Sequence, residues 1–462
     1  MPENFTPPSV ELQNRIQLAA TRITDLLLPS SLVATLCDEL EFDFRRRIYS
    51  PSVTVWMFIL QVISADHSCQ QAVARLNSWR VAQGMPRCSS ETTSYCKARL
   101  RLPLELFQRL LARTAADIYE AAAEQWLFHD REVEMVDGTT VTMADTQENQ
   151  QAFPQPTSQR PGCGFPMARV VKIISLATGA VMTIAMGPYA GKLSGETSLL
   201  RTVIDSISPG KILLADRFYA NYWIMAMSEM KQIDLVARVH QLRRVDFRRG
   251  LKLGHLDQIV AYRRPKQRPK WMTRRQYDCY PKIILVRHLR YRVTQKGFRT
   301  TEITLATTLL DAAVYTADDL ADLYYRRWQV ELHIRSVKTQ MQMEHLRCKS
   351  PEMVRKEIYC HLISYNLVRT AMVASALRFV IAPAKLSFTG AMQALEEFAA
   401  TLRLHSGRQS EQWDNLLETI HEITVGDRPG RLEPRMKKRR PKNYKLMRKP
   451  RQSITTREAL AC

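Results

Sequence analysis

The stretch "YYRRWQVELHIRSVK" holds four residues whose side chains could take part in chemistry, at the spacing Tyr-x2-Arg-x3-Glu-x6-Lys: Tyr324, Arg327, Glu331 and Lys338. At about 100° per residue in one α-helix, all four fall within a sector of about 60° and share one narrow stripe. Such a stripe can grip phosphate oxygens through its cations and bind a metal ion through its carboxylate. It can equally be a solvated charged face with an ordinary i,i+4 ion pair. The apolar residues predicted to anchor this helix to a core are Leu323, Val330, Ile334 and Val337.

Two aspartates follow short apolar runs that predict β-strands. Asp137 follows "VEMV", and Asp216 follows "KILLA". Ligands of open α/β sheets bind at the carboxyl ends of the strands, so both carboxylates are candidates for a site there. An aspartate in either position can also cap a turn or the following helix, and the sequence leaves both interpretations open. Weaker candidates, in loop or helix-surface contexts, are Asp145, Glu148 and Asp205.

These aspartates and the helical Glu331 could together hold two Mg²⁺ ions, because Mg²⁺ prefers oxygen ligands and keeps several of its waters. Two metal ions about 3.5–4 Å apart stabilise both the attacking and the leaving oxygen in a phosphodiester displacement. An arginine and a lysine on the stripe of Glu331 would be placed to bind the phosphate. The pattern therefore favours phosphoryl-transfer chemistry.

The texture of the chain predicts the elements that must position these residues. Residues 1–130 predict a helical N-terminal domain. Residues 131–240 predict three strands, a helix, a strand, a helix and a strand, which is typical of a mixed α/β sheet. A basic, β-rich insertion at 241–300 interrupts this pattern. The α/β pattern resumes at 301–380 with a strand and two long helices. Residues 381–462 predict a helical region followed by a basic tail of low hydrophobic content.

Two local signals divide these elements further. Thr178-Gly179 predicts the turn between two strands within residues 168–187, because glycine adopts turn conformations without steric cost. Thr316 predicts the N-cap of the helix that carries the stripe.

The net positive charge of the chain comes from two segments. The sequence holds 67 Lys and Arg against 45 Asp and Glu, a net charge of +22. Residues 238–299 hold 19 basic against three acidic residues (+16), and residues 428–451 hold 12 against one (+11). The remaining chain is therefore acidic, with a net charge of 22 − 27 = −5. Confined basic segments are typical of a protein that binds nucleic acid, although the second segment could also be a solvated tail.

The cysteines and the apolar runs argue against several protein classes. The nine cysteines are scattered without a Cys-x-x-Cys pair, so they indicate neither a zinc site nor a disulfide framework. The N-terminus lacks the pattern of a signal peptide. The longest apolar run, at 53–63, is too short to cross a bilayer, so no membrane partner is expected. A reducing, cytoplasmic location is the expectation.

Several of these motifs together resemble one known family. "VDGTT" with Asp137, "LLADRFY" with Asp216 and "YYRRWQVELHIRSVK" with Glu331 look like the bacterial insertion-sequence DDE transposases with the Y-R-E-K signature, the "IS four" type. The stretch "LRCKSPEMVRKEIYCHLISYNLVR" also looks like the family's continuation. The resemblance covers most of the chain and is firmest over 131–240 and 300–370.

The resemblance implies a ribonuclease-H-like core with a β-rich insertion. Its catalytic and metal-binding residues would be Asp137, Asp216 and Glu331, which lie 79 and 115 residues apart. The insertion at 241–300 would fill the longer interval. By the same resemblance, the residues that contact the DNA phosphates at the transposon end would be Tyr324, Arg327 and Lys338.

The implied activity is cut-and-paste DNA transposition. Two Mg²⁺ ions, for which Mn²⁺ can substitute, would support cleavage at the inverted-repeat ends and transfer of the freed 3′-hydroxyl into target DNA. The partners would be double-stranded DNA, bound in part by the N-terminal domain, and a second copy of the chain in a synaptic homodimer. Two alternatives stay open: a nuclease on the same core that never joins DNA, and a non-catalytic DNA-binding regulator.

Overall fold

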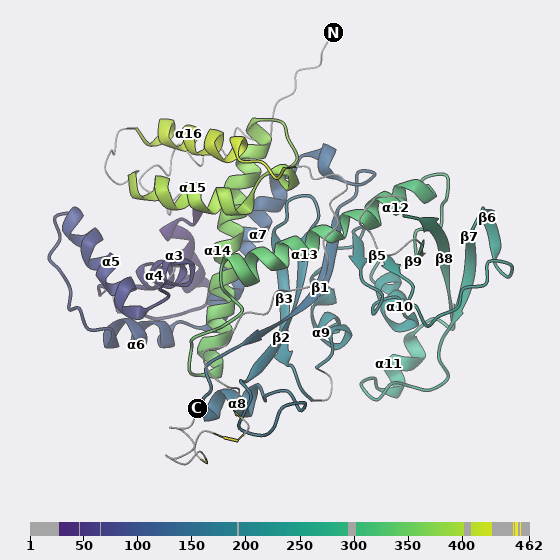
Figure 1. The fold of residues 1–462 in the computed structure, drawn as a ribbon, viewed down its shortest axis with the longest axis horizontal. Coiled ribbons are helices and arrows are strands. Elements are labelled where there is room, and N and C mark those ends of the chain that lie inside the picture. Colours follow the sequence, from purple (N-terminus) through teal and green to yellow (C-terminus); the bar gives the residue numbers. More distant parts are fainter. Residues whose placement is uncertain are drawn as a thin grey trace, which may run out of the picture. The chain divides into compact units, whose positions relative to one another are not determined.

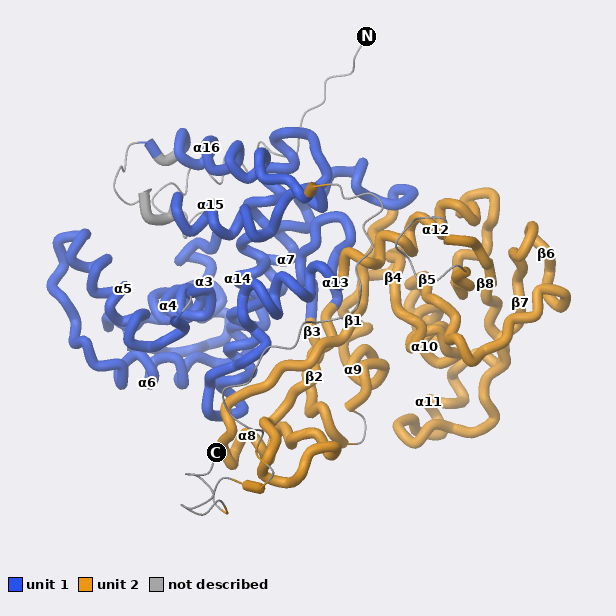
Figure 2. Tube along the Cα trace, viewed as in Figure 1, with its two compact units in different colours: residues 1–130, 173–183, 331–425 blue, residues 131–172, 184–330, 426–462 orange. Residues whose placement is uncertain are grey.

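The computed structural model describes residues 27–45, 47–64, 66–191, 194–293, 302–401, 408–426, 447, 449–450 and 453. The chain forms two compact units, each built from segments far apart in the sequence (Figures 1 and 2). Unit 1 comprises residues 1–130, 173–183 and 331–425, and unit 2 comprises residues 131–172, 184–330 and 426–462. Because the units interleave, they do not follow the five consecutive ranges predicted from the sequence, whose separate roles stay predictions. Most of the basic tail lies outside the described residues.

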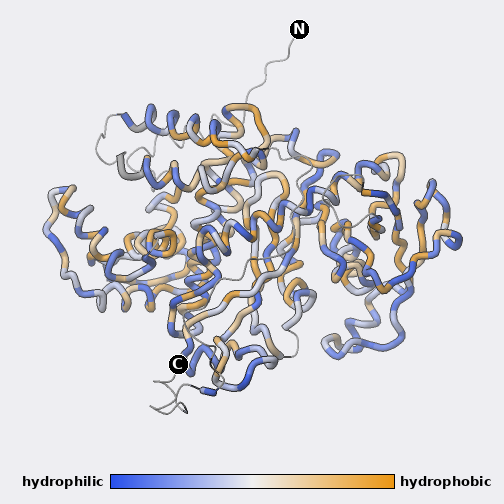
Figure 3. The backbone as a smooth tube through the Cα atoms, viewed as in Figure 1, coloured by the Kyte–Doolittle hydropathy of each residue, from blue (hydrophilic) through white to orange (hydrophobic). Residues whose placement is uncertain are grey.

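Unit 1 is helical. Its longer helices are α3 (Ser30–Glu39), α4 (Pro51–Ile63), α5 (Cys69–Ala82), α6 (Thr93–Arg101), α7 (Leu104–Glu120), α14 (Pro351–Arg378), α15 (Phe388–Thr401) and α16 (Gln409–Glu422). Helix α14 is buried along most of its length and packs against α4, α7, α15 and α16. Hydrophobic and hydrophilic residues alternate along the surrounding helices (Figure 3), as expected for helices with one buried face. The apolar run at 53–63 lies within α4, and no described helix is long and apolar enough to span a membrane.

A nine-stranded mixed sheet forms the second main part of the fold. Its strands are β1 (Val133–Thr142), β2 (Met167–Ser175), β3 (Val181–Pro188), β4 (Ile212–Ala215), β5 (Asp234–Arg238), β6 (Leu251–Gly254), β7 (Asp257–Arg263), β8 (Ile283–Arg292) and β9 (Glu302–Thr307). Their order is β3-β2-β1-β4-β5-β9-β8-β7-β6. Strands β1, β4 and β5 pair in parallel, and β5 to β6 along this order pair antiparallel. The predicted α/β class, with a mixed sheet and a helical N-terminal region, is confirmed.

The basic insertion does not stand apart from this sheet. Its strands β6, β7 and β8 extend the sheet through β9, which pairs with β5. One buried ion pair holds the extension together: the Arg287 guanidinium donates to both carboxylate oxygens of Asp257, at 2.8 and 2.5 Å, and to the Tyr315 carbonyl at 2.6 Å.

Unit 2 also contains helices, some of which contact the sheet. They are α8 (Gln147–Ala152), α9 (Glu196–Val203), α10 (Tyr222–Met230), α11 (Arg274–Cys279) and α12 (Ala317–Arg326). Helix α9 contacts β1, while α10 and α12 contact β5. The predicted cap of α12 is confirmed, since Thr316 and Asp319 form a reciprocal capping box.

The stripe predicted on one regular helix lies on an interrupted one. Helix α12 ends at Arg326, α13 (Trp328–Arg335) follows, and a π-helical turn spans Ser336–Gln340. A tightened i→i−3 bond from the Arg327 N–H to the Tyr324 carbonyl marks the first break. The π turn adds a residue to the local repeat, so a constant 100° step does not run from Tyr324 to Lys338. The predicted anchors Leu323, Val330 and Val337 are nevertheless buried.

Candidate active site

Asp137 and Asp216 stand at equivalent positions of two adjacent parallel strands. The β1–β4 ladder pairs Val133 with Ile212 and Met135 with Leu214. The same register, carried two residues further, sets Asp137 opposite Asp216. Neighbouring strands lie about 4.8 Å apart, so the two aspartates lie close together, Asp137 within β1 and Asp216 directly after β4. The sequence predicted a strand end for both, which is right for Asp216 and wrong for Asp137, because β1 continues to Thr142.

Each aspartate is fixed by the backbone that follows it. The Gly138 N–H donates to an Asp137 carboxylate oxygen at 2.7 Å, and the Arg217 N–H donates to Asp216 at 2.6 Å. Burial raises the pKa of Asp137 to about 6, against the lowering effects of the Gly138 N–H and the Arg327 charge. The negative charges of Glu196 and Asp216 raise it further. The pocket therefore resists a bare negative charge on Asp137 and favours a cation beside it.

Tyr324 and Arg327 join this pair of aspartates. The Arg327 guanidinium lies 5.8 Å from the centre of the Tyr324 ring and lowers the pKa of Asp137. Tyr324 is buried at the end of α12, and burial together with the charge of Asp216 raises its pKa to about 12. Four of the six predicted site residues thus gather in unit 2, with the tyrosine neutral and the arginine beside the carboxylates.

Glu331 and Lys338 belong to unit 1, where each has its own surroundings. Glu331 is exposed on α13, at the residue where this helix passes from unit 2 into unit 1. Lys338, in the π turn, lies 3.6 Å from Glu344. The meeting of these two residues with the aspartates stays a prediction.

A buried hydrogen-bond chain fixes the helix that carries Glu331. His333 on α13 hydrogen-bonds through Nδ1 to the Tyr365 hydroxyl at 2.9 Å, and this hydroxyl lies 2.9 Å from the Gly179 carbonyl. Gly179, the predicted turn residue, has a φ of +73°, and a Cβ there would come within 2.7 Å of the His333 ring. The turn therefore requires glycine both for its backbone conformation and for its space.

Residues that the sequence did not single out also surround the aspartates. Glu196 opens α9 and contributes to the raised pKa of Asp137, while the Arg169 charge lowers the pKa of Glu196. Tyr219 follows Asp216 in a turn and is fully buried. No sequence signal marks Glu196, because acidic residues are common in the first turn of any helix.

The weaker candidates lie in surface contexts. Asp145 and Glu148 are exposed before and on α8. Asp205 is largely exposed and forms an ion pair with Lys231. These positions match the ordinary roles of charged surface residues.

The donor chemistry of the aspartate edge fits a divalent cation. Carboxylate oxygens are the ligands that Mg²⁺ and Mn²⁺ prefer, and here the charges of Glu196 and Asp216 help to raise the pKa of Asp137. Tyr219 Oη is a buried polar atom without a hydrogen-bond partner among the described residues. The described residues contain no closed group of three or more His, Cys, Asp or Glu side chains that could hold a metal ion. Asp137 and Asp216 therefore supply part of a ligand set.

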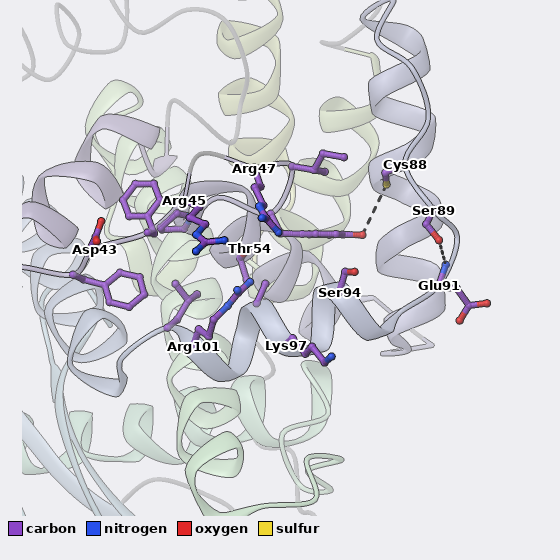
Figure 4. A pocket seen from close by; sticks show the side chains of 17 residues that line it. Asp43, Arg45, Arg47, Thr54, Cys88, Ser89, Glu91, Ser94, Lys97 and Arg101 are labelled. Atoms are coloured by element: carbon purple, nitrogen blue, oxygen red, sulfur yellow. Dashed lines mark hydrogen bonds between the residues drawn. The ribbon is translucent and has the colours of Figure 1, made fainter.

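A second candidate site lies in unit 1. A pocket of about 870 Å³ is lined by residues between Phe42 and Leu102 (Figure 4). Four exposed cations line it, against Asp43 and Glu91: Arg45, Arg47, Lys97 and Arg101. None of the four forms an ion pair with another described residue. Arg45, Arg47 and Arg101 gather on one side (Figure 4). Tyr49 also lines the pocket and brings an aromatic ring to it. Cations interleaved with aromatic rings suit a nucleic-acid backbone and its bases.

Comparisons with known proteins agree with this chemistry. The family model described as "Transposase DDE domain" matches residues 129–367, more than half of the chain. The transposase InsG of insertion sequence element IS4 from Escherichia coli (strain K12) is 26% identical over 445 residues, covering 94% of this chain and 95% of that protein. The putative transposase InsL of insertion sequence element IS186A, from the same organism, is 34% identical over 64 residues, covering 14% of this chain and 17% of that protein.

A solved structure was also found, the cryo-EM structure of the piggyBac transposase synaptic complex with hairpin DNA. Its TM-score is 0.40 at 10% identity, covering 91% of this chain and 86% of that one. The family match includes β1, β4 and the Y-R-E-K stretch, which hold all six predicted site residues. The chain therefore belongs to the family of DDE transposases, enzymes that act on DNA and generally use a divalent metal ion.

Proposed function

We propose that this transposase cuts the ends of its own insertion sequence and joins the freed 3′-hydroxyl to target DNA. The observation that supports the proposal is the β1–β4 register, which, continued by two residues, brings Asp137 opposite Asp216. Arg327 beside them supplies the positive charge that a scissile phosphate requires.

In this proposal Asp137 and Asp216, with Glu331 as the third carboxylate, would hold two Mg²⁺ ions, for which Mn²⁺ could substitute. Bound there, the ions would supply Lewis-acid stabilisation to the attacking and leaving oxygens. Arg327 binds a non-bridging phosphate oxygen, and neutral Tyr324 donates a hydrogen bond to the same strand. Lys338 contacts a neighbouring phosphate of the transposon end. The carboxylates also orient the attacking hydroxyl by accepting its hydrogen bond.

DNA binding is assigned to two basic surfaces. The pocket of unit 1 binds the transposon end, with α6 presenting Lys97 and Arg101 to the backbone. The sheet extension, with many exposed basic residues among 243–275, contacts flanking or target DNA. Two copies of the chain hold the two ends in a synaptic homodimer, because a cut-and-paste reaction needs both ends together.

Cleavage of the DNA that flanks this gene, with Mg²⁺ present, tests the proposal. Wild type is expected to cut at the ends of a flanking inverted repeat, and Asp216→Asn and Glu331→Gln are expected to bind the ends without cutting. Asp145→Asn, at an exposed position, is the control and should cut normally. Cleavage by the Asp216 or Glu331 variant at the wild-type rate would refute the site.

Joined products separate the remaining alternatives. Wild type incubated with pre-cut ends and a plasmid target should give strand-transfer products. Cutting without joining would identify a nuclease on the same core. Tight end binding with neither reaction, in wild type as well as in the variants, would identify a DNA-binding regulator.

A further inference from the structure

We infer that Glu196 is a further carboxylate of the catalytic cation site, acting on the divalent ion beside Asp137 and Asp216 through its charge and through water. This inference rests on the proposed function of the two aspartates. It adds a residue that lies outside the Asp137, Asp216 and Glu331 set, on a different element, α9.

The first observation is the space above Gly138. A Cβ built on Gly138 would lie 2.5 Å from Glu196 Cδ and 2.6 Å from its Cγ and Oε1. The carboxylate of Glu196 therefore occupies the volume that any side chain at position 138 would fill. Glu196 therefore lies against Gly138, the residue that directly follows Asp137.

The second observation is independent of the carboxylates. Tyr219 is completely buried, and its hydroxyl has no hydrogen-bond partner among the described residues. Burial and the nearby charges of Glu196, Asp137 and Asp216 raise the pKa of this hydroxyl. A buried hydroxyl normally finds a partner, because leaving one unpaired is unfavourable. A hydrated cation between the carboxylates would supply water to this hydroxyl.

The surroundings of Glu196 argue against a purely structural role. Burial raises its pKa, the Arg169 charge lowers it, and the Asp216 charge raises it again. Arg169 itself donates to the Ser194 carbonyl at 2.8 Å and lies 4.9 Å from the Tyr189 ring centre. The charges of Glu196 and Asp216 thus act on Asp137 in a partly buried place. A divalent ion relieves that repulsion, and direct chelation by all three is not needed, because Mg²⁺ keeps several waters.

Direct Mn²⁺ binding to the full-length protein tests the inference. Free Mn²⁺ is measured by electron paramagnetic resonance, and thermal unfolding is followed in EDTA without metal. Glu196→Gln removes the charge at constant size. Gly138→Ala keeps the charge but displaces the carboxylate, because only the flexible end of Glu196 must move. Glu148→Gln makes the same charge change in the first turn of α8 and serves as the control.

Glu196→Gln is expected to weaken Mn²⁺ binding about 10- to 100-fold, which is the usual effect of substituting a residue that supports the direct ligands of a metal site. Its metal-free melting temperature should equal or exceed that of wild type, because a repulsive charge is gone. Gly138→Ala should weaken binding in the same direction, and Glu148→Gln should leave it unchanged. Mn²⁺ binding by Glu196→Gln within twofold of wild type, or a lower metal-free melting temperature at unchanged affinity, would overturn the inference.

The same titration separates this inference from the proposed function. If Asp216→Asn loses Mn²⁺ binding and cleavage while Glu196→Gln keeps both, the inference fails and the proposed function stands. If Asp216→Asn keeps both, the proposed site itself is wrong, and the inference that rests on it falls too.

Discussion

Removing the charge of Asp137 should stabilise the metal-free protein while abolishing its activity. Its pKa lies at about 6 instead of the ordinary 3.8, and each pKa unit corresponds to about 1.4 kcal/mol, so keeping this carboxylate charged costs about 3 kcal/mol. Asp137→Asn removes that cost at nearly constant size. The gain is at most this value, because the amide must still accept the Gly138 N–H.

The sign of the pH dependence follows from the same pKa. A carboxyl whose folded-state pKa is raised contributes stability below pH about 4 and loses it as the pH rises to about 6. The stability advantage of Asp137→Asn should therefore be full near pH 7.5 and should disappear near pH 4. Added Mg²⁺ should reverse the order at pH 7.5, because only wild type gains the full binding energy of the metal.

Chemical denaturation in EDTA at several pH values measures this difference. Asp145→Asn is the matched control, and its effect should stay within about 0.5 kcal/mol at every pH, as for other exposed positions. An Asp137→Asn variant that is less stable than wild type in EDTA at pH 7.5 would refute the reasoning. It would mean that the Asp137 carboxylate is stabilised by its neighbours and needs no cation.

Three further perturbations probe other parts of the molecule. The double variant Arg47→Ala/Lys97→Ala should weaken binding of the transposon end in an anisotropy titration, and the slope of log affinity against log salt should fall by about one per lost phosphate contact. Arg109, which is paired with Glu39 and Glu105, provides the control: Arg109→Ala should change neither the affinity nor the slope. Asp257→Ala removes the ion-pair partner of the buried Arg287 and should lower the free energy of unfolding by about 3–5 kcal/mol. Asp278→Ala breaks the exposed ion pair with Arg274 and should lower it by less than about 1 kcal/mol. Equal losses in the two variants would contradict a stabilising role of the buried ion pair. Tyr365→Phe removes the hydroxyl that pairs with His333 and the Gly179 carbonyl, so it should lower the free energy of unfolding by about 1–3 kcal/mol. It should also slow DNA cleavage, because the helix that carries Glu331 becomes less ordered. Tyr359→Phe, on the same helix as Tyr365, is the control.

Part of the site is written in the spacing of the sequence. The separation of 79 residues between Asp137 and Asp216 equals the separation of Val133 and Ile212, which pair in the parallel ladder. Two apolar runs, each followed by an aspartate, therefore suffice to put two carboxylates on neighbouring strands. Local rules also determined the Gly179 turn and the Thr316 cap, because both depend on the conformational preferences of neighbouring residues.

Tertiary packing decided the rest. The approach of Glu196 to Gly138 joins residues 58 positions apart on a helix and a strand, and no periodic pattern records such a contact. The helix that carries the stripe is interrupted around Arg327 and Ser336, although the sequence favours a continuous helix. Burial of the apolar residues on both sides of each break competes there with the regular repeat of about 3.6 residues. The basic insertion joins the sheet because β9 has an open edge of β5 to pair with, and an unpaired edge is costly. The sequence by itself thus determined which residues can do the chemistry, and only the packing of distant segments decided which further groups surround them.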